Sequence, residues 1–167
     1  MKIKPLFYGF LVSVMLLVSC EEDQLANRPI SDAYLVFGTF AGLCQDDCVH
    51  YYLLDMQERR LYKLENQKYP SVDNDLNLLN AERVQLPDED FQVAKQLMDK
   101  LPKQIIDETD PTIGCPDCLD QGGFYLSFSE SDVTYEFLLD TRGDAIPSYL
   151  QNYTEDLRNV ISEIRPE

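Results

Sequence analysis

The stretch Phe124–Leu139 reads FYLSFSESDVTYEFLL, with two runs of alternating side chains separated by the polar turn Glu130-Ser131-Asp132. Two such runs around a short polar turn are typical of a β-hairpin, because successive side chains of a strand point to opposite faces. The larger apolar residues fall on one side of each run: Phe124, Leu126 and Phe128, then Val133, Tyr135, Phe137 and Leu139. We therefore expect a hairpin that buries one face against a core.

Three more strands are expected upstream of this hairpin. Apolar, β-branched and aromatic residues are concentrated in Ala33–Phe40 (AYLVFGTF), Cys48–Asp55 (CVHYYLLD) and Arg59–Glu65 (RRLYKLE), with short turns between them. Such runs favour the extended conformation. Cys48–Asp55 carries apolar or amphipathic side chains on both faces, which indicates a strand inside the sheet. Arg83–Leu86 is a candidate for one further short strand.

Two helices are expected, one before and one after the hairpin. Asp88 follows Pro87 and precedes two more acidic residues, a pattern that favours a helix start through capping and the helix dipole. This helix is expected to end near Pro102, and the second to begin near Pro147. Apolar residues recur at helical spacing in both segments: Phe91, Ala94, Leu97, Met98 and Leu101, then Ile146, Tyr149, Leu150, Tyr153, Leu157, Val160, Ile161 and Ile164.

The expected order of elements is β-β-β-α-β-β-α. This order predicts an α+β fold, an antiparallel sheet of about five strands with two helices packed on one face. Hydrophobic side chains make up 44% of the 167 residues, which is enough for a core. We expect one domain over residues 31–167.

The chain is acidic, with 14 Lys and Arg against 30 Asp and Glu and a formal net charge of −16. Nucleic-acid binding needs a basic patch that displaces counterions, so we expect no nucleic-acid partner. Electrostatic docking on an anionic membrane is disfavoured for the same reason.

The first twenty residues have the pattern of a targeting segment. Lys2 and Lys4 are followed by Leu6–Val18, thirteen residues without a charge, whereas a membrane-spanning helix needs about 20 apolar residues. A short apolar run after a basic start is typical of a secretory signal peptide. The run ends in Leu17-Val18-Ser19-Cys20.

The sequence Leu17–Cys20 (LVSC) resembles the lipobox of bacterial lipoproteins. The resemblance implies that signal peptidase II cleaves after Ser19, that the Cys20 thiol carries a diacylglyceryl group, and that an acyl chain such as palmitate modifies the new amine. It implies a signal peptide over 1–19, a lipidated tether over 20–30, and a protein anchored in the outer membrane, facing the periplasm or the surface. The alternatives are an ordinary secretory signal, which prefers an A-x-A-like site, and an uncleaved anchor, which needs a longer apolar run.

Four further cysteines form two close pairs, Cys44 with Cys48 and Cys115 with Cys118. Because an exported protein lies in an oxidising compartment, we expect disulfides, and three connectivities are open. In each case the two loops should be neighbours, since each precedes a strand that enters the sheet from one end. The same thiolates, with His50 in place of one, would alternatively suit zinc. The Cys-Pro-Asp-Cys spacing would also suit a redox-active pair, although a loop rather than a helix is expected after it.

Two segments of the body resemble small bacterial envelope lipoproteins with a C-x3-C and a G-C-P-D-C-x-D-x-G-G motif. They are Phe37–Tyr52 (FGTFAGLCQDDCVHYY) and Ile113–Tyr125 (IGCPDCLDQGGFY), and the resemblance implies no activity. His50 is the only histidine, so a Cys-His nucleophile would have to pair it with Cys48. The acidic pairs that could serve acid–base chemistry if buried are Asp46 with Asp47 and Asp117 with Asp120.

We expect a non-catalytic binding or structural module rather than an enzyme, with no catalytic residue and no cofactor. Its expected partners are the membrane, through the lipid on Cys20, and another envelope protein, because the ten tyrosines suit an interface. The alternative is an envelope metal-binding or thiol-redox protein that uses Cys44, Cys48, Cys115 and Cys118, with zinc as the metal.

Overall fold

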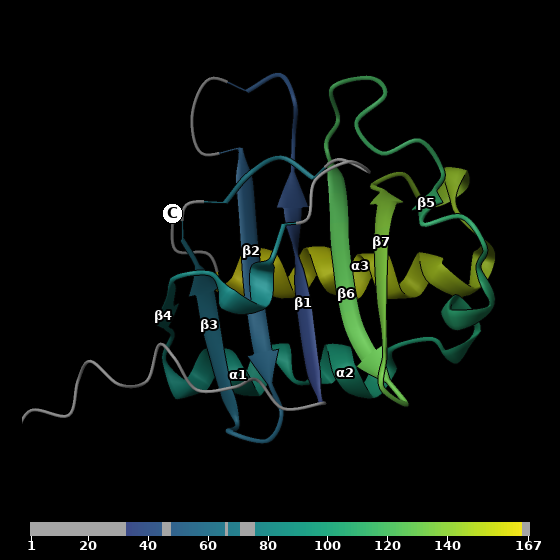
Figure 1. Cartoon of the computed structure of the whole chain (residues 1–167). Helices are drawn as coiled ribbons and strands as arrows, with labels where there is room; N and C mark the ends of the chain where they lie inside the picture. The colour runs from purple at the N-terminus through teal and green to yellow at the C-terminus, as the bar shows by residue number, and fades with distance from the viewer. Residues whose placement is uncertain (1–32, 45–47, 66, 71–75, 165–167) are drawn as a thin grey trace, which may run out of the picture.

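The computed structural model describes residues 33–44, 48–65, 67–70 and 76–164. These residues form an α+β fold built on one seven-stranded sheet, with the strand order β4-β3-β2-β1-β6-β7-β5 (Figure 1). The strands are β1 Tyr34–Phe40, β2 Val49–Asp55, β3 Arg60–Leu64, β4 Arg83–Gln85, β5 Thr112–Ile113, β6 Gly123–Glu130 and β7 Val133–Asp140.

The sheet corrects the sequence prediction in strand number and direction. The sequence predicts about five antiparallel strands, whereas the sheet has seven and β5 runs parallel to β7. The five longer strands are the expected ones. The short strand β4 falls within the candidate segment Arg83–Leu86, whereas β5 has two residues and is too short for side-chain alternation to reveal it. The backbone N–H of Leu138 donates to the carbonyl of Pro111 at 2.8 Å, which helps to hold β5 at this edge.

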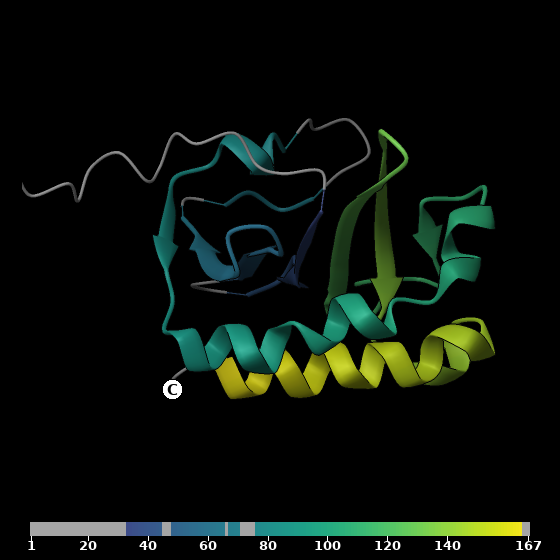
Figure 2. The ribbon, with the colours of Figure 1, turned by 90° about the horizontal axis from the view of Figure 1, so that it is seen from below.

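The longer helices cover one face of the sheet (Figure 2). The first expected helix forms as two short helices that meet at Lys95, whose carbonyl accepts a hydrogen bond from the N–H of Met98 three residues on, as in a 3-10 turn. The expected end before Pro102 is confirmed. The helices are α1 Asp88–Ala94, α2 Gln96–Lys100 and α3 Ser148–Ile164, and the 3-10 turns are η2 Leu78–Asn80, η3 Lys103–Asp107 and η4 Gly143–Ala145.

The larger core lies between the sheet and these helices. The predicted hairpin, β6 with β7, faces it with the expected side chains except Val133, which is 50% exposed at the turn. Leu126 and Leu139 are fully buried. The apolar faces of α1, α2 and α3 meet the same layer. Its strand residues include Leu35, Phe37, Tyr52, Leu54, Leu61, Phe124, Leu126, Phe128, Phe137 and Leu139.

The opposite face of the sheet has a second, smaller core that is rich in tyrosine. Tyr51 and Tyr125 lie on either side of Gly38 in the sheet register, and their rings meet with centroids 5.0 Å apart. Part of the segment 66–80, for which the sequence predicts no element, covers this face, because Leu76 and Leu78 pack against the cluster. The protein therefore buries both faces of its central strands.

Tyr153 on α3 buries a hydroxyl group in the larger core, and its cost to stability can be measured. It is 2% exposed, and its hydroxyl has no hydrogen-bond partner in the described part of the chain. A buried donor without a partner costs about 1–3 kcal/mol. We expect Tyr153→Phe to raise the free energy of unfolding in urea by about 1 kcal/mol.

The matched control lies one turn away on the same helix. The hydroxyl of Tyr149 donates to Oε1 of Glu108 at 2.5 Å, so Tyr149→Phe removes a made hydrogen bond and should lower stability by about 1 kcal/mol. A destabilised Tyr153→Phe protein would show that the buried hydroxyl is satisfied in solution.

Candidate functional site

The four cysteines of the body are joined locally. Cys44 is bonded to Cys48 and Cys115 to Cys118, with Cα atoms 5.7 and 5.5 Å apart. Of the three open connectivities, the structure therefore shows the one with the shortest loops. The first loop joins β1 to β2, and the second precedes β6.

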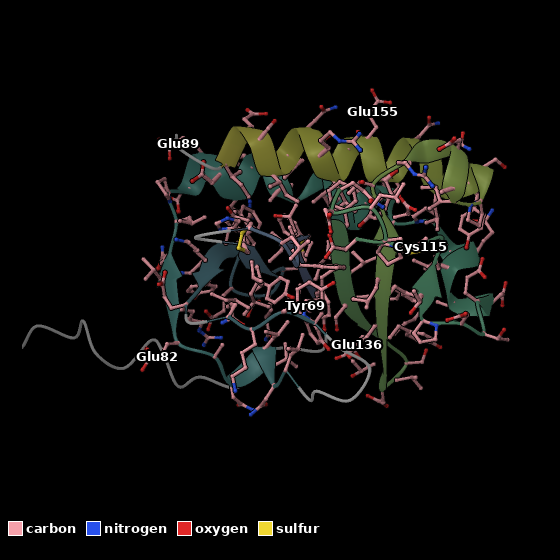
Figure 3. The ribbon with its side chains drawn as sticks, turned by 90° about the horizontal axis from the view of Figure 1, so that it is seen from above. Tyr69, Glu82, Glu89, Cys115, Glu136 and Glu155 are labelled. Carbon is pink, nitrogen blue, oxygen red and sulfur yellow. A yellow bond between two sulfur atoms is a disulfide. The ribbon has the colours of Figure 1, made fainter. Side chains whose placement is uncertain are left out.

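The two disulfide loops are neighbours, as the sequence predicts, and the Asp117 carboxylate joins them. Its Oδ2 accepts hydrogen bonds from the backbone N–H of Gly42 at 2.6 Å and from the hydroxyl of Tyr69 at 2.9 Å. Its Oδ1 accepts one from the N–H of Gly122 at 2.9 Å. We call this end of the sheet the disulfide end, comprising residues 42–44, 48, 69 and 114–122 (Figure 3 looks onto it, with Tyr69 and Cys115 labelled).

Local backbone geometry explains why this loop needs its residue types. Asp117 has φ +61°, a left-handed conformation that Asp tolerates better than most residues, and its N–H donates to the carbonyl of Gly122. Gly122 has φ +71°, and a Cβ there would lie 2.6 Å from the carbonyl oxygen of Phe40. The second loop can therefore approach the end of β1 only with glycine at position 122.

A second carboxylate, which is fully buried, anchors the other side of the same loop. Asp140 ends β7 with no exposed surface, and its Oδ2 accepts a hydrogen bond from the N–H of Cys115 at 3.0 Å. Its Oδ1 accepts one from the N–H of Arg142 at 2.8 Å. The loop is thus fixed to β7 by Asp140 and to the first loop by Asp117.

Tyr69 completes the disulfide end from the tyrosine-rich face. Its ring packs edge-on against Phe40 with centroids 5.3 Å apart. Partial burial, and then the hydrogen bond and negative charge of Asp117, raise the pKa of Tyr69 to about 12. Tyr69 therefore acts as a neutral hydrogen-bond donor at physiological pH.

The residues considered for catalysis are not assembled into an active site among the described residues. His50 is buried in β2 opposite Thr39, and Cys48 beside it is bonded to Cys44 rather than free for a dyad. Asp117 is engaged in the loop contacts above. Asp46, Asp47 and the lipidation candidate Cys20 lie outside the described residues.

The described side chains do not form a metal site. Within residues 33–44, 48–65, 67–70 and 76–164, no group of three or more His, Cys, Asp or Glu side chains is placed to hold a metal ion. In the same ranges, no helix has the length and apolar character needed to cross a membrane.

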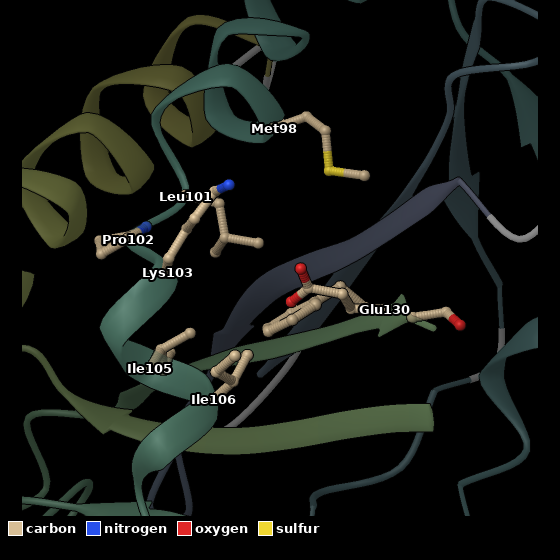
Figure 4. A pocket seen from close by; sticks show the side chains of 9 residues that line it. Met98, Leu101, Pro102, Lys103, Ile105, Ile106 and Glu130 are labelled. Atoms are coloured by element: carbon tan, nitrogen blue, oxygen red, sulfur yellow. The ribbon is translucent and has the colours of Figure 1, made fainter. Parts of the chain in front are cut away.

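An apolar groove lies at the other end of β6, away from the disulfide loops (Figure 4). Its volume is about 220 Å³, below the roughly 300–1,000 Å³ of typical small-molecule sites. Strand β6 lines it with Phe128, Ser129 and Glu130, and Lys103 brings a charge opposite to that of Glu130. The remaining lining comes from α2, η3 and the segment between them: Met98, Leu101, Pro102, Ile105 and Ile106.

Sequence reasoning missed Asp117 as a joint between loops, and it missed Tyr69 and Asp140 altogether. An aspartate between two close cysteines is a usable signal, because Asp side chains commonly bond nearby backbone N–H groups in turns. No local signal marks Tyr69, since its partner is 48 residues away. A comparison of the chain with known protein families, curated proteins and solved structures finds no match.

The short disulfide loops predict a limited role for the two bonds in stability. Closing a loop of four or five residues stabilises a fold by about 2 kcal/mol on a chain-entropy model. We expect the Cys44→Ser/Cys48→Ser and Cys115→Ser/Cys118→Ser proteins each to lose about 2 kcal/mol in urea unfolding and to keep the sheet by circular dichroism. Complete unfolding on reduction would contradict this, and would indicate that the disulfide end holds the sheet together.

Proposed function

We propose that the protein is a lipid-anchored lipoprotein of the bacterial cell envelope, held in the outer membrane by acyl chains on Cys20. Its body is a non-catalytic binding module that contacts another envelope protein. The LVSC sequence and the short apolar run before it support the anchor.

The observation that carries the binding role is the position of the disulfide end relative to the start of the domain. β1 begins at Tyr34 beside the β6–β7 turn, because Leu35 pairs with Phe128. It ends at Phe40 beside the disulfide loops (Figure 1). Seven strand residues span about 23 Å. The braced loops and the entry of the chain are therefore at opposite ends of the sheet.

A lipid on Cys20 would hold the domain from the end at which β1 begins. The chain from Cys20 to Ala33 reaches at most about 45 Å. Without residues 1–19 the 14 basic residues become 12 and the net charge becomes −18, which repels anionic head groups. The attachment at the start of β1 favours an orientation with the disulfide end facing away from the bilayer, and the negative charge keeps the domain clear of the head groups.

The anchor is tested by substituting the lipidated residue in the native cell. Two acyl chains already hold a protein stably on a membrane, so the wild-type protein should sediment with membranes and enter detergent. Cys20→Ala should remain an unprocessed precursor or appear in the soluble fraction, without acyl label. Ser19→Ala keeps a small residue before Cys20 and is the matched control, which should remain acylated.

Wild-type protein that takes up no acyl label would contradict the anchor.

The alternative function is metal binding or thiol–disulfide exchange by Cys44, Cys48, Cys115 and Cys118. The mass of the protein as isolated distinguishes a zinc site from the disulfide-bonded form. Two disulfides lower the mass by four hydrogens, whereas a zinc site would retain the thiols and bind stoichiometric metal.

A further inference from the structure

Two leucines at the disulfide end are turned out into solvent. Leu43 is 80% exposed and Leu119 is 72% exposed, the highest values among the large apolar side chains of the described residues. Single exposed leucines are common on protein surfaces. Here each adjoins a disulfide cysteine, Leu43 before Cys44 and Leu119 after Cys118, so both lie on braced loops.

The hydrogen bonds of the disulfide end join the two loops that carry these leucines. Leu43 follows Gly42 directly, and the N–H of Gly42 donates a hydrogen bond to Asp117. Asp117 lies two residues before Leu119 in the second loop. Tyr69, which is 40% exposed, is bonded to the same carboxylate oxygen. Leu43, Leu119 and Tyr69, from segments far apart in sequence, thus lie on backbone that Asp117 joins.

Rigid presentation makes these side chains suitable for binding. Association costs about 0.5–1.5 kcal/mol for each side chain that must be immobilised, and more when a loop must be ordered. The disulfides and the Asp117 contacts already order the backbone beside Leu43 and Leu119. Their exposure also means that the fold gains little from them, so their apolar area is available to a partner.

The charges around this surface specify the chemistry of that partner. Asp120 is exposed beside Leu119, Asp117 is half-buried, and Lys68 is the basic neighbour of Tyr69. With a net charge of −16 for the chain, two copies would repel each other, as would the chain and an anionic bilayer. A protein surface with an apolar centre and a rim of Lys and Arg would be attracted.

We propose that Leu43, Leu119 and Tyr69 form the docking surface for another envelope protein, one that receives the two leucines in an apolar contact area bordered by basic side chains. The inference rests on the proposed binding role and names its surface. It does not require the lipid, so its failure can be told apart from a failure of the anchor.

The test begins with a photoreactive amino acid placed in the full-length protein in its native cells. Positions 43 and 119 are the test sites. Val84 and Val133, which are 53% and 50% exposed and lie outside the disulfide end, are the controls. We expect one protein to be cross-linked from 43 and 119 and not from 84 or 133.

The cross-linked protein is then purified, and its affinity for the native lipoprotein in detergent is measured by calorimetry. Leu43→Asp and Leu119→Asp should each weaken binding at least tenfold, whereas Val84→Asp and Val133→Asp should leave it unchanged. Binding should also weaken as salt is raised, because the basic rim is screened.

The proposal is overturned if the cross-links from 43 and 119 go to lipid, to a second copy of this chain or to nothing. It is equally overturned if the purified pair binds with the same affinity after both leucines are replaced. Cross-linking and affinity as expected, in a protein that carries no acyl chain, would keep this surface and remove only the anchor.

Discussion

Gly38→Ala is expected to destabilise the sheet severely. Gly38 lies in the middle of β1, the central strand, and pairs with Tyr51 on one side and Tyr125 on the other. A Cβ at this position would lie 1.9 Å from the carbonyl oxygen of His50 and 2.7 Å from the ring of Tyr51. The first clash is with backbone, which can move only if β1 and β2 separate.

The cost should therefore exceed the usual 1–3 kcal/mol of overpacking and reach about 4 kcal/mol or more. It is measured by urea unfolding followed by circular dichroism, with expression in inclusion bodies as the extreme outcome. Gly143→Ala is the matched control, because nothing lies within 4 Å of its Cβ position, and it should be neutral or slightly stabilising. A Gly38→Ala protein with unchanged stability would show that β1 and β2 are not paired in this register.

Alkaline pH is the second condition expected to have a large effect. Burial is the main cause that raises the pKa of Tyr51, Tyr125 and Tyr153, and the pKa of Tyr69 rises to about 12 through burial and Asp117. An unfolded tyrosine loses its proton near pH 10. Above that pH the folded protein binds more protons than the unfolded chain, so stability falls as pH rises.

The stabilisation linked to these groups is therefore complete below pH 10 and is lost above it. We expect unfolding in alkali to be cooperative, with tyrosinate absorbance at 295 nm rising together with the loss of circular dichroism. Each tyrosine that ionises only after unfolding steepens the fall by about 1.4 kcal/mol per pH unit.

Tyr153→Phe supplies the control for this pH dependence. It removes one ionising group, so the free energy of unfolding should fall above pH 10 with a slope that is shallower by about 1.4 kcal/mol per pH unit. The pH dependence below pH 9 should be unchanged. Tyrosinate formation by every tyrosine in a protein that keeps its circular dichroism would contradict the burial of these rings.

The sequence predicts the long elements of this fold well because their side-chain periods are complete. The hairpin of Gly123–Glu130 and Val133–Asp140 has eight residues in each strand, and the alternation is unambiguous. Ser148–Ile164 is long enough to show a full apolar helix face. The edge strand β4 lies within the candidate segment Arg83–Leu86. The other edge strand, β5, cannot be found from the sequence because two residues carry no period, and only its pairing with β7 defines it.

The sequence predicts that the two cysteine loops are neighbours, but not how their cysteines pair or which side chain joins the loops. The pairs of close cysteines and the direction of the strands place both loops at one end of the sheet. Which sulfurs are bonded, and which carboxylate joins the loops, depends on backbone positions that only the folded sheet determines. Asp117 could be read as an acid–base candidate, whereas the structure uses it to hold Gly42 and Tyr69.

The lipid on Cys20 is tested most directly by the intact mass of the protein extracted from its native cells. We expect recovery from the membrane fraction of a chain that begins at Cys20, carries the added mass of its acyl chains and is four hydrogens lighter than the fully reduced form. Recovery from the aqueous fraction of a chain without acyl groups would contradict the anchor and the envelope location that depends on it.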